Sequence, residues 1–367
     1  MAKVSRAMVQ TGARTLQMRE FPLPVLSEDD GLLKVEACGL CITDVSQYQG
    51  DYNAWMQYPV VPGHEPVGII DRIGPVAAKR WGVKEGDRVA VEAPLPCHSC
   101  KQCRRGNYNL CTRYQRLSCY AWIPIETPPS PLWGAYADYM YLDPHSIVHR
   151  AGSRVPAELL ALFDAVAAGV HWAVQWQQTP GGDTIVIIGC GQRGLSCVVA
   201  GKESGAARII VVGLRREADQ LAVARELGAD YTIVADERDV LVEVKRLSGG
   251  TGADVVVDTT PLAAMSLARA IEMVARGGTV ALAGPKKPSR ASDLCSDVIM
   301  EKGIRVLGST GVPWQANEAA LRIIESGRHR LDKMHSHTVP LERAEYALQL
   351  LADEIPGESA LHIAITP

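Results

Sequence analysis

The stretch Thr184-Ile-Val-Ile-Ile-Gly189-Cys-Gly191-Gln-Arg-Gly194 joins an unbroken apolar run to a G-x-G-x-x-G motif. An apolar run of this length is typical of a strand that is buried on both faces of a parallel sheet. A helix-length segment follows to about Gly201, and a second apolar run begins at Arg208. In such a unit the first glycine permits a tight turn, the second lets a pyrophosphate approach, and the third lets the helix pack closely on the sheet. The stretch therefore predicts a dinucleotide-binding fold, and the alternative is a structural turn that holds no ligand.

The position that commonly distinguishes the two nicotinamide dinucleotides carries no acid in this chain. Where such folds place an Asp or Glu for the ribose hydroxyls, about twenty residues after the motif, the residue is Gly213, and Arg215 and Arg216 follow it. A small residue with arginines beside it indicates a site for a 2'-phosphate, so we expect NADP(H). The alternative is that both arginines are solvated and that Glu217 or Asp219 binds the ribose of NAD(H).

Further apolar runs at residues 254–257, 279–283 and 304–307 alternate with helical patterns. Alternating strands and helices predict an α/β fold with a doubly wound parallel sheet of the Rossmann type. Ligands of such sheets bind outside the carboxyl ends of the strands. We therefore expect Thr259, Gly284 and Ser309, which follow these runs, to contribute to the cofactor site.

Four cysteines, Cys97, Cys100, Cys103 and Cys111, form a C-x2-C-x2-C-x7-C run. Four thiolates can complete a tetrahedral zinc site and leave no open position, so we expect a structural zinc. Disulfides and an iron-sulfur cluster are the alternatives. The ferredoxin pattern closes with a three-residue gap and a proline, which this run lacks.

The beginning of the chain contains Lys3 and Arg6 but no apolar stretch of the kind found in secretory signals. We therefore expect a cytoplasmic protein in a reducing compartment, where thiolates are favoured over disulfides.

The length of 367 residues predicts two domains, and the net charge of -3 provides no electrostatic basis for binding nucleic acid. No apolar segment approaches the length that spans a membrane. We expect neither nucleic acid nor membrane among the partners.

A second group of metal-ligating residue types lies in the first half. Cys41, the adjacent His64 and Glu65, and the later Asp164 offer sulfur, imidazole and carboxylate, which are the ligands that a catalytic zinc uses. Cys38 belongs to an alternating apolar segment and is expected to pack in the core.

These motifs occur in the order found in a known family. The run Cys38-Gly-Leu-Cys-Ile-Thr-Asp44, the sequence Pro62-Gly-His-Glu65, the sequence Gly86-Asp-Arg-Val89, the four-cysteine run and the glycine motif all match. The chain resembles the zinc-dependent medium-chain alcohol dehydrogenases, and it is most similar to the sorbitol and threonine dehydrogenase branch.

The resemblance implies a split catalytic domain and an active site in a cleft between the domains. The catalytic domain, a GroES-like β-barrel with a structural zinc lobe, would comprise residues 1–155 and 313–367, and the Rossmann domain would comprise residues 156–312.

The resemblance also implies the roles of individual residues. Cys41, His64 and Asp164 would hold a catalytic zinc. Asp164 stands in place of the more usual glutamate and has a shorter side chain, so direct contact and a water bridge to the metal are the alternatives. Asp44 would orient His64, Glu65 would approach the metal during ligand exchange, and Thr43 would receive the substrate proton.

Where many relatives end the proton relay with histidine, this chain has Ser46, so the proton is expected to leave through water or the cofactor ribose. The alternative for Thr43 and Ser46 is local backbone bonding around a turn.

Four aromatic residues fall in loops that approach the substrate in the family: Trp55, Tyr58, Trp122 and Trp133. They predict a bulky apolar pocket, and ordinary packing of large side chains is the alternative. With few cationic residues in these loops, we expect an uncharged, hydrophobic secondary alcohol or ketone as the substrate.

The predicted activity is a zinc-dependent transfer of hydride between an alcohol and a nicotinamide cofactor. Two alternatives remain: a zinc-independent enone or quinone reductase on the same fold, and a non-enzymatic nucleotide-binding module. Because family members are dimers or tetramers, we expect a homodimer or homotetramer.

Overall fold

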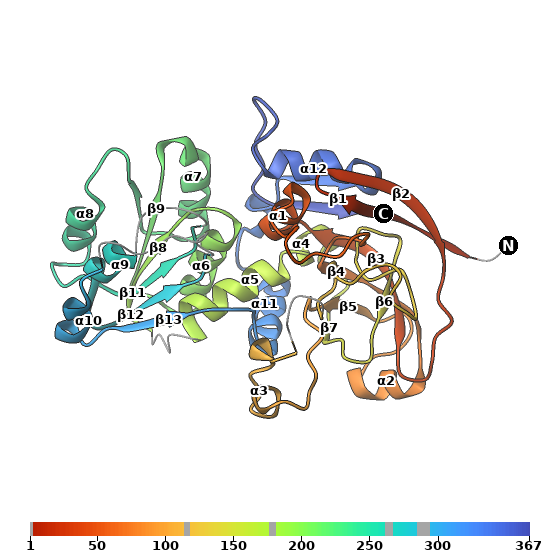
Figure 1. Cartoon of the computed structure of the whole chain (residues 1–367). Helices are drawn as coiled ribbons and strands as arrows, with labels where there is room; N and C mark the ends of the chain where they lie inside the picture. Colours follow the sequence, from red (N-terminus) through yellow and green to blue (C-terminus); the bar gives the residue numbers. More distant parts are fainter. Residues whose placement is uncertain (1–2, 114–117, 176–180, 261–266, 285–293) are drawn as a thin grey trace. The chain divides into compact units, whose positions relative to one another are not determined.

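The computed structural model describes residues 3–113, 118–175, 181–260, 267–284 and 294–367 (Figure 1). The chain forms two compact units. The first comprises Met1–Asp164 and His335–Pro367, and the second comprises Ala165–Met334.

The chain returns to the first unit later than the predicted boundary at residue 313. The segment after α11 (Trp314–Ser326) is tied to helices of the second unit by charged side chains. Arg328 and His329 both contact Glu203 at the end of α6, and Lys333 Nζ lies 3.4 Å from the Glu226 carboxylate on α7. These ion pairs are contacts within the second unit, which extends to Met334.

The first unit contains a seven-stranded sheet and a separate hairpin. The sheet order is β14-β15-β3-β4-β5-β7, with β6 paired to β3, and the hairpin joins β1 and β2. The strands are β1 (Val4–Gly12), β2 (Thr15–Pro22), β3 (Gly31–Gly39), β4 (Glu65–Ile73), β5 (Arg88–Val91), β6 (Tyr139–Leu142), β7 (Val148–Arg150), β14 (His337–Pro340) and β15 (Ile363–Thr366). The helices are α1 (Ile42–Gln49), α2 (Pro75–Trp81), α3 (Lys101–Arg104), α4 (Ala157–Leu160) and α12 (Ala344–Leu351), with short helical turns at η1 (Tyr108–Leu110) and η5 (Leu341–Arg343).

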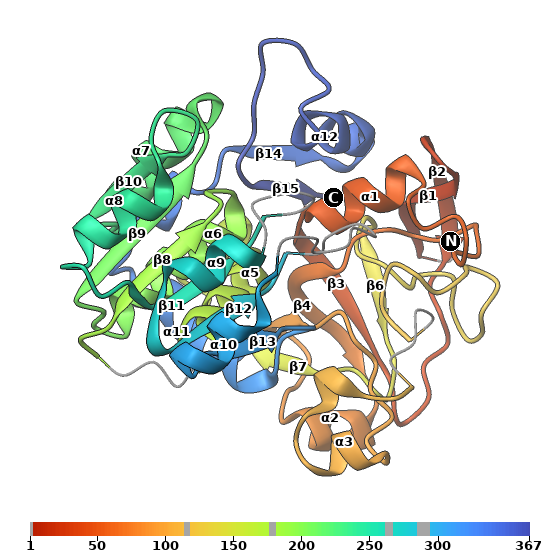
Figure 2. The same ribbon diagram turned by 60° about the vertical axis from the view of Figure 1, so that its left-hand side comes forward.

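The return segment completes this sheet. It forms β14 and β15 around α12, and α12 packs on both strands (Figure 2). β15 pairs with the end of β3, where Ala364 lies opposite Gly39. The apolar side chains of these elements join one core cluster with those of the N-terminal strands.

The second unit is built on a six-stranded parallel sheet in the order β10-β9-β8-β11-β12-β13. Its strands are β8 (Thr184–Ile188), β9 (Arg208–Gly213), β10 (Tyr231–Val234), β11 (Ala253–Asp258), β12 (Val274–Leu282) and β13 (Arg305–Gly308). Its other helices are α6 (Gln192–Glu203), α7 (Ala218–Leu227), α8 (Val240–Leu247), α9 (Leu267–Met273) and α10 (Ser296–Lys302), with short turns at η3 (Arg215–Glu217) and η4 (Leu331–Lys333). This strand order, which reverses between β8 and β11, is that of the predicted Rossmann fold.

One helical run in the described part of the chain, Ala157–Gln175, is long and apolar enough to cross a membrane by length and composition. It includes α4, α5 (Phe163–Val170) and the π-helical turn η2 (His171–Gln175). Within its most apolar window, 72% is buried inside the structure, which is the behaviour of a core helix in a soluble fold. Glu158 and Asp164 interrupt the run, so it is not an uninterrupted apolar segment of the kind that the sequence analysis considered.

A buried histidine in the return segment makes stability depend on pH. His362 is fully buried, its Nδ1 lies 3.0 Å from Nδ1 of His335, and burial followed by the charge of His335 lowers the pKa of His362 to about 3. Because the unfolded chain binds this proton near pH 6.5, stability should be complete above that pH and fall as pH decreases towards 3.

We expect His362→Gln to lose about 2 kcal/mol less free energy of unfolding than the parent between pH 6.5 and pH 5, as measured by urea unfolding. The exposed His98→Gln is the control and should retain the parent slope. Equal slopes for parent and His362→Gln would contradict the assignment.

Candidate metal and cofactor sites

The end of β3 and the start of β4 bring three metal-ligating side chains together. One ligand atom each from Cys41, His64 and Glu65 lies within 4.8 Å of the others. The cause is the antiparallel register, in which Gly39 at the end of β3 is opposite Glu65 at the start of β4. A side chain at position 39 would not fit, because its Cβ would lie 2.6 Å from Glu65 Oε2 and 2.8 Å from the carbonyl oxygen of Ala161.

Asp44 holds two members of this group in place. One carboxylate oxygen accepts a hydrogen bond from the backbone N–H of Cys41 at 2.9 Å, and the other lies 3.1 Å from His64 Nδ1. The first contact caps helix α1, which begins directly after Cys41. The second leaves Nε2 as the ring nitrogen available to a metal, an arrangement that orients histidine ligands in many metal sites.

Asp164 is not part of the three-residue group that lies within 4.8 Å, so its expected role as a zinc ligand stays a prediction. Asp164 lies in the first turn of α5. Burial raises the pKa of Glu92, and the negative charge of Asp164 raises it further to a smaller extent. The third member of the group is Glu65, which is brought beside His64 by its place in the chain and has a longer side chain than aspartate.

The three-residue group fits a divalent cation. Cys41, Glu65 and the neighbouring Asp44 can each carry a negative charge, and all three are buried. Burial alone would lower the pKa of His64, but the charges and hydrogen bonds of Asp44 and Cys41 raise it well above its ordinary value. A site that attracts a proton onto a buried imidazole in this way favours a positive charge, and sulfur, nitrogen and carboxylate oxygen together suit zinc.

Two hydroxyl residues follow Cys41 on α1. Thr43 Oγ1 lies 3.2 Å from Cys41 Sγ, so it is placed beside the metal-ligating group. Ser46 is half-buried one turn further on, and its hydroxyl influences the pKa of Tyr52. Tyr52 was not among the residues predicted for the site.

The four cysteines of the second group also lie within 4.8 Å of one another. Their sulfurs are separated by 3.5 Å (Cys97 to Cys111), 4.0 Å (Cys97 to Cys103) and 4.0 Å (Cys100 to Cys111). Four sulfurs at about 2.3 Å from one zinc stand about 3.8 Å apart, whereas a disulfide requires about 2.05 Å. The arrangement matches a closed tetrahedral site, and none of the described cysteines is in a disulfide.

The backbone of this lobe also favours thiolates. The N–H groups of Cys97, Cys100 and Cys103 point at the sulfurs of Cys111, Cys97 and Cys100 respectively. Hydrogen bonds from the Cys103 and Thr112 backbones lower the pKa of Cys100 to about 5. Burial and the neighbouring thiols raise the pKa of Cys103 to about 12, so the backbone favours the thiolate, which is the form that binds zinc, at Cys100 and not at every cysteine of the lobe.

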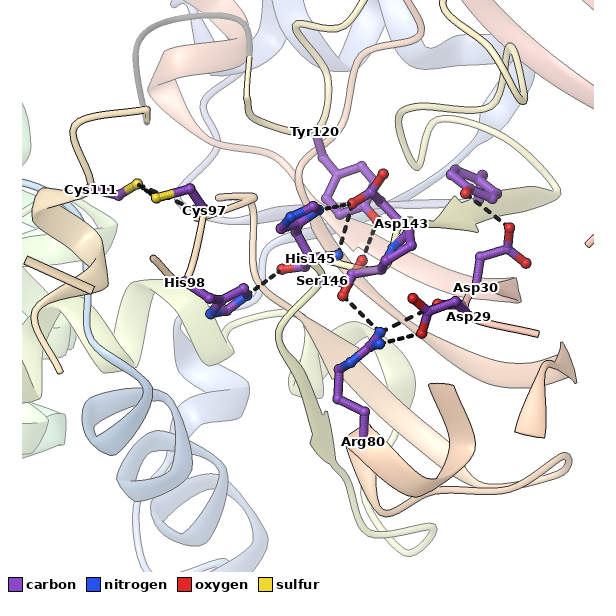
Figure 3. Close-up of polar contacts among 12 residues, drawn as sticks. Asp29, Asp30, Arg80, Cys97, His98, Cys111, Tyr120, Asp143, His145 and Ser146 are labelled. Atoms are coloured by element: carbon purple, nitrogen blue, oxygen red, sulfur yellow. Dashed lines mark hydrogen bonds and ion pairs between the residues drawn. The ribbon is translucent and has the colours of Figure 1, made fainter. Parts of the chain in front are cut away.

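The histidines around the lobe bind protein groups instead (Figure 3). His98 Nε2 lies 3.4 Å from the carbonyl oxygen of His145, and His145 Nδ1 lies 2.9 Å from the Asp143 carboxylate. His149 Nε2 lies 2.7 Å from Glu92, which also accepts a hydrogen bond from Tyr108 in the lobe. Among the described residues, His64 is the one histidine that belongs to either metal-ligating group.

The glycine motif forms the turn between β8 and α6. Gly189 has φ of 102°, and a Cβ there would lie 2.7 Å from Thr259 Oγ1. A Cβ at Gly194 would overlap the carbonyl oxygen of Gly189, whereas Gly191, the N-cap of α6, faces open space. This leaves the helix N-terminus accessible at Gly191, as a pyrophosphate requires.

The other predicted cofactor residues lie at the carboxyl ends of the strands. Thr259 donates to the carbonyl oxygen of Ile188 at 2.9 Å, and a Cβ at Gly284 would collide with the backbone of Thr260. The N–H of Ser309 donates to Leu282, so Ser309 lies at the end of β13 beside β12. These three positions are thus brought to the carboxyl edge of the sheet, next to the glycine turn.

Gly213 is buried at the end of β9, and a side chain there would meet Cys190, because its Cβ would lie 2.7 Å from Cys190 Sγ. Arg215 is exposed and pairs with Glu237 at 3.0 Å. Arg216 is also exposed. Glu217 accepts a hydrogen bond from the backbone N–H of Leu214 at 2.7 Å, so it caps the turn that carries the arginines.

The predicted aromatic residues do not form one group. Trp55 and Trp122 pack edge to face at a centroid distance of 5.3 Å, and both contact Tyr52. Burial and then the charge of Cys41 raise the pKa of Tyr52, which places this aromatic cluster beside the metal-ligating group.

Two of the predicted aromatic residues have structural contacts. Trp133 is buried in the core, where it packs on Tyr141 and donates to the carbonyl oxygen of Thr127 at 3.0 Å. Tyr58 donates to Asn53 at 3.0 Å. Trp133 is therefore a core-packing residue, the alternative considered for it in the sequence analysis, because its indole N–H already has a partner within the fold.

Comparison with known proteins shows the family. The alcohol dehydrogenase GroES-like domain matches residues 27–153, and the zinc-binding dehydrogenase domain matches residues 194–326. A protein of Mycobacterium tuberculosis named "probable alcohol dehydrogenase" is 41% identical over 99% of both chains. The chain belongs to the zinc-dependent alcohol dehydrogenase family. It is therefore an oxidoreductase that transfers hydride and acts on the CH–OH group of its donor.

Other alcohol dehydrogenase relatives share the sequence or the fold. An erythritol/L-threitol dehydrogenase of Mycolicibacterium smegmatis is 31% identical over 99% of this chain and 97% of its own length. The crystal structure of an alcohol dehydrogenase from Thermotoga maritima superposes with a TM-score of 0.88 over 100% of both chains at 23% identity. An alcohol dehydrogenase from Thermus has a TM-score of 0.82 at 25% identity and covers 98% of this chain and 99% of its own.

The four-cysteine lobe gives a test of metal content. We expect Cys100→Ala to lower the zinc content of this alcohol dehydrogenase by about one equivalent per chain, because three sulfurs no longer close the tetrahedron. Its unfolding temperature should fall as the zinc contribution to folding is lost. Cys295→Ala, at an exposed cysteine outside the lobe, is the matched control and should leave both zinc content and unfolding temperature unchanged. Unchanged zinc in Cys100→Ala, measured by elemental analysis, would contradict the structural site.

Proposed function

We propose that this alcohol dehydrogenase oxidises an uncharged, apolar secondary alcohol, or reduces the corresponding ketone, with NADP(H) as the cofactor. The observation that carries this proposal is the position of the Cys41, His64 and Glu65 group beside the cluster of Tyr52, Trp55 and Trp122. The first set can hold a metal for alcohol chemistry, and the second supplies apolar surface for the substrate.

Two zinc ions per chain are part of the proposal. Cys97, Cys100, Cys103 and Cys111 would hold a structural ion, and Cys41, His64 and Glu65 would hold a catalytic one, with Glu65 in the place first expected for Asp164. A catalytic zinc with an open position lowers the pKa of an alcohol and polarises a carbonyl.

The remaining steps depend on side chains of the first unit. Asp44 keeps the His64 ring oriented through Nδ1, and its second oxygen holds the Cys41 backbone. Thr43, 3.2 Å from the Cys41 sulfur, is placed to receive the proton that the alcohol loses. Ser46 cannot act as a base near neutral pH, so the proton would leave Thr43 through water or, with a cofactor bound, through its ribose.

The cofactor preference follows from the end of β9. Gly213 leaves no carboxylate at the usual ribose position, and Cys190 Sγ occupies the space into which a side chain would extend. Arg216 is exposed, while Arg215 already pairs with Glu237. Arg216 is therefore the stronger candidate for the 2'-phosphate, and Arg215 would contribute after exchanging its partner.

The substrate class rests on the aromatic cluster. Flat apolar rings such as Trp55 and Trp122 bind hydrocarbon surface through burial and ring contacts. Relatives named for erythritol, L-threitol and sorbitol make polyols the second candidate class. A polyol needs several hydrogen-bonding side chains around it, whereas the cluster mainly offers ring faces.

The alternative functions are less consistent with these residues. A zinc-independent enone or quinone reductase would not need cysteine, histidine and carboxylate side chains gathered in one buried site. A nucleotide-binding module without activity would not need them either.

For assembly, we propose a homodimer or homotetramer in the cytoplasm. Among the described strands, β13 lies at one end of the parallel sheet and pairs only with β12. A strand edge of this kind can extend the sheet across a twofold axis.

The catalytic assignment can be tested with Cys41→Ser. We expect at least a thousandfold loss of alcohol oxidation and a decrease in zinc from two equivalents per chain to one, because a hydroxyl is a much poorer zinc ligand than a thiolate. The measurement pairs metal analysis with turnover of alicyclic alcohols, polyols and enones. Cys197→Ser, at a cysteine in α6 outside both groups, is the control. One zinc in the parent together with turnover of enones alone would favour the reductase, and polyol turnover alone would overturn the apolar substrate class.

The cofactor assignment can be tested with Arg216→Ala. Loss of a charge-assisted contact to the 2'-phosphate should weaken NADP(H) binding about tenfold or more and leave NAD(H) binding nearly unchanged. Arg238→Ala, which removes an exposed arginine further along this unit, is the control. Dissociation constants from nicotinamide fluorescence give the comparison, and equal losses for both cofactors would contradict a phosphate contact.

A further inference from the structure

Tyr136 is a fully buried tyrosine next to the metal-ligating group. Its backbone N–H donates to the carbonyl oxygen of Pro62 at 2.9 Å, and the N–H of Ala135 donates to that of Gly63 at 2.9 Å. These bonds hold Tyr136 against the segment that leads into His64. The ring lies on Gly63, where a Cβ would be 2.7 Å from Cε1 of the ring.

The hydroxyl of Tyr136 has no hydrogen-bond partner among the described residues. A buried polar group in this condition destabilises a fold, so a phenylalanine would be the more stable choice for packing alone. Burial, followed by the charges of Asp44, Cys38, Glu65 and Cys41, raises the pKa of Tyr136 well above its ordinary value. A tyrosine hydroxyl is an O–H donor at neutral pH in any case, and the ring lies against the segment that leads into His64.

Most of these neighbours already have defined contacts. Both oxygens of Asp44 are engaged, one by the Cys41 backbone and one by His64. Cys38 Sγ lies 3.4 Å from the carbonyl oxygen of Gly39, and Cys41 Sγ contacts Thr43. Glu65 is a carboxylate with several acceptor positions, and it can accept a bond from Tyr136 in addition to its other contacts.

We propose that Tyr136 is a positioning residue of the metal site: its hydroxyl, which has no partner among the described residues, would donate a hydrogen bond to the Glu65 carboxylate when a metal is bound and would hold Glu65 as a ligand. This inference rests on the proposed function, because it requires a metal at Cys41, His64 and Glu65. Carboxylates that bind metals are generally held by further hydrogen bonds, and removing such a partner typically weakens metal binding 10–100-fold.

The matched pair of variants is Tyr136→Phe and Tyr141→Phe. Tyr141 is also buried, but its hydroxyl is bonded to Asp30 at 3.1 Å. We expect Tyr136→Phe to bind the catalytic zinc at least tenfold more weakly in competition with a chelator, while the unfolding temperature of the zinc-free protein stays the same or rises. Tyr141→Phe should retain parent zinc affinity and unfold about 2–4 °C lower.

A double-mutant cycle with Glu65→Ala tests whether Tyr136 acts through Glu65. In that background Tyr136→Phe should change zinc affinity less than twofold, because the acceptor is gone. An undiminished effect would overturn the proposal, as would parent zinc affinity in Tyr136→Phe alone. If the proposed function is wrong, the parent protein itself will lack the zinc equivalent that Cys41→Ser is expected to remove. The zinc content of the parent therefore distinguishes this failure from failure of the role proposed for Tyr136.

Discussion

The antiparallel pairing of β3 with β4 is the constraint on which the metal site depends. Because Gly39 lies opposite Glu65, the chain leaves β3 towards Cys41 at the same end of the pair from which His64 enters β4. Residues more than twenty positions apart in the sequence are thereby brought within 4.8 Å. The same register explains Gly39, since the Glu65 carboxylate and the Ala161 carbonyl leave no space for a side chain there. The return segment reinforces this end of the pair through β15, which bonds to β3 next to Gly39.

Buried charge is the energetic cost of this arrangement. Cys41, Asp44 and Glu65 lie in a small buried volume, where negative charges repel one another unless a positive charge is present. Asp44 reduces the cost by bonding to the Cys41 backbone and to His64. The hydroxyl of Tyr136, which has no partner in the part of the chain that the structure describes, adds to the same energetic cost. A side chain that is unfavourable for packing is expected at functional sites, which agrees with its proposed contact to Glu65.

Much of the fold could be predicted from local sequence patterns. The apolar run 184–188 and the following glycines correspond to β8 and the turn into α6, because strand periodicity and glycine geometry are local properties. The predicted strand at 279–283 is longer in the structure, where β12 begins at Val274 with an irregular register that no local pattern indicates. The sequence-based boundary was set at residue 313, whereas the compact second unit extends to Met334, a segment in which Arg328, His329 and Lys333 pair with distant glutamates.

By itself, the sequence determined the family motifs, the four-cysteine lobe and the residue types of the metal site, since spacing within one loop or one strand carries that information. Only the tertiary structure decided that Glu65 rather than Asp164 joins Cys41 and His64, that Trp133 is a core residue, and that Tyr52 and Tyr136 lie by the site. The physical reason is that these choices depend on strand register and on which side chains share a buried volume. Both are set by contacts between segments far apart in the chain.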